Sequence, residues 1–459
     1  MTTHDEAPTP PLTGMLTLDG LKKWVDEGLI TTVLPVLPNM GGLLRGKRLS
    51  ARKFAEAASQ PGHPVAEACA YVLATDIDMN PVDVYDLTSW LSGFQDMGAV
   101  PDLDTIRILP RSSGTALVHC DAVHPGGQPV QVAPRHMLRR QLDALTSEHG
   151  VQLRVGLESE VVLYDATSLR PVTEHNLDYS LQHPRGLTLF FTELERALAF
   201  SATPAESVKT EGSPGQVEVA FPYGPAMRAC DDYTVYKHLL KEIADDHGMR
   251  PTFMAAPQTE VASGLHVHVS LWQGDEPAFA VTEFKELPEV MRHAIAGLLF
   301  VLPDLAPLYA PNPNSYRRYQ PYSFAPTHYT WGVDNRTCAI RVTGHGKGTH
   351  LEVRLPGADA NPYLAVAAVC AAINYGLASS LEPPEPWAGD GYEAEDDKGV
   401  RPVPGSLTAA ARALESSGIA NECFGGDVVT HYATAAYQEV KALEQLVPDT
   451  EINRYRDRI

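Results

Sequence analysis

Two glutamates at alternate positions interrupt an otherwise apolar stretch, QLRVGLESEVVLYD, in which they are Glu158 and Glu160. Residues two positions apart on a β-strand point to the same face of the sheet, so these carboxylates would lie side by side. Two neighbouring carboxylates repel each other unless a cation separates them. A pair of this kind on a solvent-exposed strand face is common, so on its own it indicates a metal site only weakly.

Three more segments repeat the pattern of polar residues on one strand face. They are His266, His268 and Ser270 in SGLHVHVSLW, Glu352 and Arg354 in THLEVRLP, and Glu211 and Glu218 around the turn in TEGSPGQVEVAF. Each segment alone has an ordinary explanation, such as surface or core histidines. Together, five carboxylates and one or two imidazoles on neighbouring strands make a coherent metal site. Ligands rich in carboxylate favour hard divalent cations, Mg²⁺ or Mn²⁺, over zinc.

Basic residues gather between residues 317 and 354, a segment that ends within THLEVRLP. They are Arg317, Arg318, Arg336, Arg341, Lys347 and Arg354. Salt bridges to an acidic surface explain such a cluster equally well when it is taken alone. Arginine forks also match the geometry of phosphates and carboxylates, and metal-bound carboxylates beside them indicate phosphoryl transfer from a nucleotide. No G-x-x-x-x-G-K-[ST] motif occurs, so a P-loop does not hold that nucleotide.

The composition narrows the class of protein. The chain has 459 residues, 44% of them hydrophobic, which predicts a folded protein of two to four domains. Its formal net charge of −21 argues against nucleic acid or membrane surfaces as partners. The six cysteines include no C-x-x-C pair, which excludes a zinc ribbon and a dithiol redox site. The polar, Pro-rich start MTTHDEAPTPPL is unlike a secretory signal, so we expect a cytoplasmic protein.

The elements that would position these residues belong to an α+β fold. An apolar stripe predicts a short helix within residues 16–30, followed by strands on both sides of Gly41 and Gly42. From about residue 115, strand patterns alternate with long helical ones, which predicts a mostly antiparallel sheet. Residues 359–382 carry no internal charge, but the N-cap and proline at Asn361 and Pro362 favour a buried helix of a soluble protein over a membrane span.

Taken in order, the motifs GLESE, EGSPGQVE, SGLHVHVSLW, NSYRR, DNRTCAIRV, HLEVRLPGADANPYLA and EINRY resemble the glutamine synthetase family. The resemblance covers residues 16–459. It implies a β-grasp domain at 16–112 and a catalytic domain with a curved, mostly antiparallel sheet at 113–459, and we expect the polar, Pro-rich segment 1–15 before them to be disordered. It also implies a homo-oligomer of hexameric rings, commonly stacked as dodecamers, with active sites between adjacent subunits.

The resemblance carries over residue by residue. It implies one divalent ion on Glu160, Glu211 and Glu218, and another on Glu158, His266 and Glu352. The positions that match those lining the phosphates of ATP are His268, Ser270, Arg341 and Lys347. Arg318 and Arg354 match residues that grip the carboxylates of glutamate, and Arg336 matches the arginine that stabilises the transferring phosphoryl group. In this family ATP phosphorylates the γ-carboxylate of glutamate, and an amine nitrogen then displaces phosphate.

Four departures from the family pattern bear on the nucleophile and the substrates. Phe324, in PYSFAP, replaces the glutamate that takes a proton from ammonium, so we expect it to line a slot for an amine that carries carbon. VASG at 261–264 replaces N-G-S-G, which leaves Gly264 as the match at a substrate-binding position. His350 stands where many relatives carry an arginine to phosphate. Asp76 and Asp78 stand roughly where the ammonium-site aspartate is missing, so we expect them at the substrate site.

LLRGKRL and the SFAP…WG.DNRT pattern further resemble the branch of γ-glutamylpolyamine and γ-glutamylmonoamine synthetases. The sequence therefore predicts an ATP-dependent ligase that joins glutamate to an organic primary amine, in amine catabolism. One alternative is a true glutamine synthetase that uses ammonium. The other is an inactive homologue kept as a binding or regulatory subunit.

Overall fold

The computed structural model describes residues 13–284, 286–396 and 399–459. Most of the segment 1–15, which the sequence predicts to be disordered, lies outside these residues. Of its described part, Gly14 donates a backbone hydrogen bond of 2.6 Å to the carbonyl of Phe200, and Met15 forms a β-bridge with Arg107. The end of this segment is therefore attached to the folded protein.

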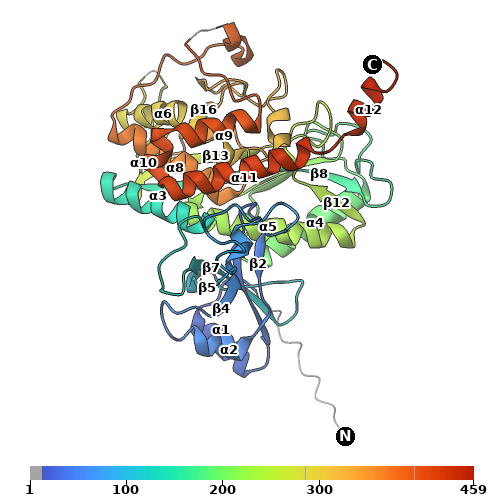
Figure 1. The fold of residues 1–459 in the computed structure, drawn as a ribbon, viewed down its shortest axis with the longest axis vertical. Helices are drawn as coiled ribbons and strands as arrows, with labels where there is room; N and C mark the ends of the chain where they lie inside the picture. Colours follow the sequence, from blue (N-terminus) through green and yellow to red (C-terminus); the bar gives the residue numbers. More distant parts are fainter. Residues whose placement is uncertain (1–12, 285, 397–398) are drawn as a thin grey trace.

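The first sheet forms a small lobe at one end of the molecule (Figure 1). Its strands follow the order β2 (Leu44–Gly46), β1 (Thr32–Pro38), β7 (Thr115–Val123), β5 (Asp96–Pro101) and β4 (Ala66–Cys69), with β3 (Leu49–Ser50) beside β1 and β6 (Arg107–Ile108) beside β7. β1 and β7 run parallel at its centre, and their neighbours run antiparallel to them. The helices α1 (Leu18–Asp26) and α2 (Ala51–Ala57) complete the lobe (Figure 1).

The second sheet carries the chemistry-bearing segments. Its order is β15 (Trp331–Val333), β16 (Ile340–Thr343), β17 (His350–Val353), β13 (Leu265–Gln273), β8 (Gln152–Asp165), β10 (Gln216–Ala220) and β9 (Ser207–Thr210). β11 (Gly224–Pro225) and β12 (Met249–Thr252) pair with β8, and β14 (Glu276–Pro277) pairs with β13. All these pairings are antiparallel except the one between β15 and β16. The predicted α+β class with a mostly antiparallel sheet is confirmed.

Helices pack around this second sheet (Figure 1). They are α3 (Pro134–His149), α4 (Arg185–Phe200), α5 (Ala226–Asp246), α6 (Glu289–Val301), α7 (Ala306–Tyr309), α8 (Pro362–Ala378), α9 (Leu407–Ser416), α10 (Gly418–Phe424) and α11 (Gly426–Glu444). The last helix, α12 (Asp449–Tyr455), buries none of its residues and projects from the body near the C-terminus (Figure 1). Within the described ranges, none of the helices combines the length and the apolar character needed to cross a bilayer.

The predicted N-cap of α8 is present. The side chain of Asn361 accepts a hydrogen bond of 3.0 Å from the backbone N–H of Tyr363, and Pro362 occupies the first turn, where its missing N–H costs nothing. The Asn361 amide also donates to the carbonyls of Asn39 and Met40, at 3.1 and 2.9 Å. Asn361 thus attaches the hairpin between β1 and β2 to α8, one of the helices that pack around the second sheet.

The division between the two sheets differs from the predicted boundary at residues 112 and 113. β7 (Thr115–Val123) lies beyond that boundary but pairs with β1 and β5 of the first sheet. A boundary between Val123 and Pro134 would leave both sheets whole. The strand pattern of TALVHCDA shows that a strand forms but not which sheet it joins. The division into two domains stays a prediction.

Candidate active site

Strand register places the predicted metal ligands opposite one another. Glu158 on β8 faces His266 on β13, and Glu160 on β8 faces Glu218 on β10. Glu352 on β17 faces His268 on the other side of β13. Because alternate residues of a strand share a face, these pairings gather side chains from four strands on one side of the sheet.

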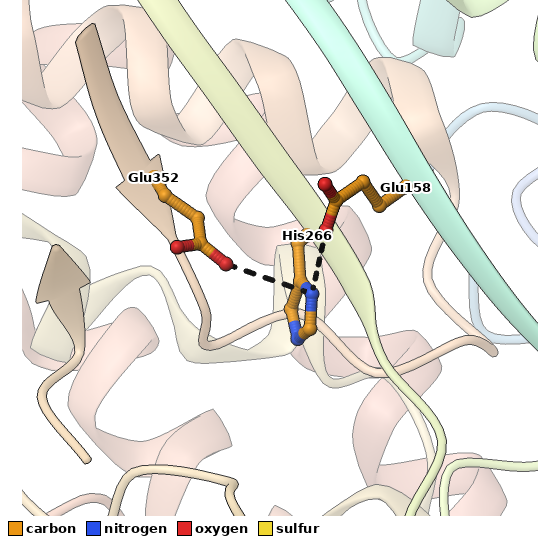
Figure 2. Close-up of side chains that lie close together, drawn as sticks. All are labelled: Glu158, His266 and Glu352. Atoms are coloured by element: carbon orange, nitrogen blue, oxygen red, sulfur yellow. Dashed lines mark hydrogen bonds and ion pairs between the residues drawn. The ribbon is translucent and has the colours of Figure 1, made fainter. Parts of the chain in front are cut away.

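The first cluster consists of Glu158, His266 and Glu352 (Figure 2). The Nδ1 atom of His266 lies 3.3 Å from an oxygen of Glu158 and 3.7 Å from an oxygen of Glu352. One ligand atom from each residue lies within 4.8 Å of the others. Burial opposes ionisation of Glu158, but hydrogen bonds from His266 and His268 outweigh it and lower the pKa of this carboxyl. A charged carboxylate is therefore ready to bind a cation.

The second cluster consists of Glu160, Glu211 and Glu218, which also offer ligand atoms within 4.8 Å of one another. Burial, together with the negative charge of Glu158, raises the pKa of Glu218 to about 8. The ammonium group of Lys209 partly neutralises the cluster, since it donates a hydrogen bond to Glu211 and lies 3.7 Å from Glu218. Even with Lys209 nearby, Glu218 resists ionisation, and a divalent cation bound among these carboxylates would favour its charged form.

The guanidinium groups of Arg341 and Arg354 lie on opposite sides of the Glu352 carboxylate. Arg341 donates to one oxygen at 2.8 Å, and Arg354 donates to the other. Glu352 is 1% exposed, so the two cations compensate a charge that water does not reach. Arg318 is buried as well. Its two Nη atoms donate hydrogen bonds to the carbonyls of Arg354 and Leu355, while its Nε atom has no hydrogen-bond partner.

A single cavity of about 700 Å³ connects both clusters with the predicted substrate residues. Its lining includes all six candidate metal ligands together with Arg318, Arg336, Arg341, Arg354, Lys209 and Phe324. The side chain of Phe324 is 63% exposed, and its neighbour Tyr322 is 80% exposed. Both residues have positive φ angles, 57° and 65°, which is unusual for large side chains and typical of strained segments at functional sites.

The predicted nucleotide residues line an adjacent cavity of about 300 Å³. His268, Ser270 and Lys347 contribute to its wall, and Glu158 borders both cavities. The Nδ1 atom of His268 lies 2.9 Å from the Nε2 atom of His350, so the histidine that replaces an arginine is part of this wall. Arg341, also predicted to contact phosphates, lines the larger cavity instead.

Gly264 lies beside the first cluster. Its N–H donates a hydrogen bond of 2.7 Å to Glu160. A Cβ atom at this position would lie 2.8 Å from Arg318 Nη2 and 2.9 Å from His266 Nε2, so any larger residue would displace these two side chains. Asp76 and Asp78, in contrast, line neither cavity: Asp76 borders a different one and Asp78 is exposed. Their predicted contact with substrate is not made within a single chain and stays a prediction for the assembled ring.

The predicted site residues do not include Lys209, Trp272 and Arg154, which line the two cavities. Lys209 lies two positions before Glu211, so the same alternation that identified the glutamates could have revealed it. Trp272 follows Ser270 by two positions and donates a 2.8 Å hydrogen bond to its hydroxyl. The guanidinium of Arg154 lies 3.8 Å from the centre of the Trp272 ring, which makes one wall of the smaller cavity aromatic and cationic.

Comparison with known proteins gives a consistent result. A family profile described as glutamine synthetase, catalytic domain, matches residues 131–455. The chain is 41% identical to the gamma-glutamylethanolamide synthetase of Streptomyces coelicolor, over 98% of this chain and 97% of that protein. It is 32% identical to the glutamate–isopropylamine ligase of a Pseudomonas species, over 95% of this chain and 97% of that protein.

Among solved structures, a GmaS/ADP complex superposes with a TM-score of 0.82. The alignment covers 95% of this chain and 99% of that one, at 24% sequence identity. This likeness shows a shared fold across both sheets.

Proposed function

The chain belongs to the glutamine synthetase family, and from this premise we propose that it is an ATP-dependent ligase joining the γ-carboxylate of glutamate to an organic primary amine. In the proposed reaction a carboxylate oxygen accepts the terminal phosphoryl group of ATP and ADP leaves. The amine nitrogen then attacks the acyl carbon, phosphate leaves, and the nitrogen loses a proton. The product is a γ-glutamylamide, as expected of a protein in amine catabolism.

The observation that carries the proposal is the composition of the larger cavity. Two carboxylate clusters, four arginines and Phe324 line the same space of about 700 Å³. Arginines beside acidic metal ligands suit a reaction in which the protein mainly positions and neutralises phosphate charge. We assign Arg318 and Arg354 to glutamate and Arg336, which is exposed to the cavity and free of ion pairs among the described residues, to the transferring phosphoryl group.

The two clusters fit Mg²⁺ or Mn²⁺. Their donors are carboxylates with a single imidazole, and burial together with the negative charge of Glu158 raises the pKa of Glu218, so a bound cation would favour its ionised form. We propose that Glu158, His266 and Glu352 hold one ion and that Glu160, Glu211 and Glu218 hold another. Bound there, the ions would neutralise charge on the phosphates of ATP.

Phe324 distinguishes a ligase that uses an organic amine from a glutamine synthetase that uses ammonium. Ammonium offers only hydrogen-bond donors and must lose a proton before it attacks, so its site needs a carboxylate. The benzyl group of Phe324 supplies none, but it offers apolar surface to an alkyl group at about 0.8 kcal/mol for each buried methylene. The names of the two relatives, which specify ethanolamide and isopropylamine, support an organic amine. An inactive homologue is disfavoured because it would have no use for six metal-ligand positions.

Release of phosphate from ATP in the presence of glutamate tests the proposal. Ammonium, ethanolamine, short alkylamines, anilines and polyamines are compared as the third substrate. We expect release that depends on both glutamate and an organic amine. Release with ammonium but with none of the organic amines would indicate a glutamine synthetase. No release with any third substrate would indicate the inactive homologue.

A further inference from the structure

A separate cavity of about 410 Å³ lies between the first sheet and the helices behind the second. The hairpin between β1 and β2 forms one wall, and residues of α5, α8 and α11 form the others. This volume lies in the range of about 300–1,000 Å³ that is typical of small-molecule sites. None of the predicted metal or nucleotide residues lines it.

Two lysines on one face of α5 line this cavity, and neither forms a salt bridge with a described residue, although the charge of Asp359 attracts Lys237. Lys237 is 6% exposed, and Lys241 lies one turn further along the helix. Neither forms a hydrogen bond or an ion pair within the described chain; the nearest groups to the Lys237 ammonium include the ring of Phe253, whose centre is 4.7 Å away. Burial, and to a lesser degree Lys241, lowers the pKa of Lys237 to about 8. A buried ammonium without a partner is costly, so a bound anion would stabilise it.

Three acidic residues, Asp76, Asp359 and Glu439, line the same cavity. The Oδ1 atom of Asp359 is buried without a hydrogen bond, while its Oδ2 atom accepts from Asn312 and Ser315. Glu439 on α11 is half-buried and, in the described part of the chain, forms no ion pair with either lysine. Asp359 and Lys237 attract each other, but no salt bridge among the described residues joins an acid of this cavity to either lysine, so the charges compensate each other only in part.

We propose that this cavity is a second, non-catalytic binding site for a free α-amino acid. A zwitterion supplies a carboxylate for Lys237 and Lys241 and an ammonium for Asp359 or Glu439, so it compensates both sets of charges at once. A simple anion such as phosphate would instead place extra negative charge beside the two acids. The apolar side chains of Phe253 and Leu364 offer contact to the side chain of the amino acid.

Titration calorimetry on the full chain without nucleotide tests the proposal. The probes are L-leucine, L-glutamine and L-glutamate, with glutarate as a dicarboxylate that has no ammonium and isopentylamine as an ammonium that has no carboxylate. We expect at least one amino acid to bind at one site per chain. Lys241→Ala and Glu439→Gln should each weaken that binding about tenfold or more. Lys237→Met should abolish binding. Lys237 is buried, so this variant could unfold, but the variants at the more exposed Lys241 and Glu439 still test the proposal.

The control variant is Lys441→Ala, an exposed lysine of α11 outside the cavity, which should bind as wild type does. Repeating the titration with Glu160→Ala separates this site from the active site, because binding here should persist when that cluster is disrupted. The result does not depend on amine-driven phosphate release, so the two proposals fail separately. Glutarate binding as tightly as any amino acid, or no amino acid responding to the Lys241 and Glu439 changes, would overturn the proposal.

Discussion

The ammonium nitrogen of Lys209 lies 3.7 Å from a carboxylate oxygen of Glu218, and the two residues face each other across β9 and β10. The lysine also lies 4.5 Å from the centre of the Tyr179 ring, at the edge of the same cavity. A fixed cation thus shares the cluster of carboxylates that we assign to a divalent ion. It reduces the repulsion among these carboxylates before an ion binds.

Replacing Lys209 with methionine should make the metal-free protein less stable, because three carboxylates lose their compensating charge. The expected loss is about 1 kcal/mol, since the groups are partly screened by solvent. Bound Mg²⁺ should restore most of it, so the metal-induced rise in stability is larger in the variant. Denaturant unfolding in EDTA and in Mg²⁺ measures this difference, and Lys23→Met at an exposed pair on α1 serves as control. An equal metal-induced rise in wild type and Lys209→Met would contradict the account.

The affinity for the second ion should increase with pH. Glu218 has a pKa of about 8 in the metal-free protein, so it carries a proton at neutral pH and must release it when an ion binds. Below pH 8, each fall of one pH unit should therefore weaken the apparent affinity for the ion by up to about tenfold. Titrations with Mn²⁺ between pH 6.5 and 9, in buffers of different ionisation enthalpy, report both the affinity and the released proton. A pH-independent affinity without proton release would rule out this assignment.

Activity should require the two clusters. Glu160→Ala and His266→Ala each remove a ligand and leave the charges of their neighbours uncompensated, so turnover should fall at least about 100-fold. Glu422→Ala, at an exposed position on α10, is the matched control. Circular dichroism establishes that the variants fold. Full turnover by enzyme stripped of divalent ions would reject the metal site itself.

The family resemblance also predicts a ring. Light scattering should give a mass that is a multiple of six chains of 49.9 kDa. Asp76 and Asp78 lie outside the active-site cavity of their own chain, so only assembly would bring them to a substrate site, that of an adjacent subunit. A monomer that keeps full activity would contradict this expectation.

Much of the site follows from alternation along single strands. Glu158 and Glu160 on β8, and His266 and His268 on β13, lie on one face because of the two-residue period alone. The pairing of β13 with both β8 and β17 joins segments distant in the sequence, and no local pattern specifies it. For the same reason the sequence did not show that β7 joins the first sheet. The hydrogen bond from Arg354 to Glu352 does not follow from the sequence either, because the family resemblance matches Arg354 to glutamate and Glu352 to a metal ion.

We expect Phe324 to select an organic amine over ammonium. The test is kcat/KM for ammonium and for a panel of primary amines, measured in wild type and in Phe324→Glu. Apolar contact with a few methylenes predicts that wild type favours an organic amine by roughly 10-fold to 200-fold. The glutamate variant should shift towards ammonium, because a carboxylate can hold ammonium and accept its proton. A wild-type enzyme that prefers ammonium over every amine in the panel would contradict the account.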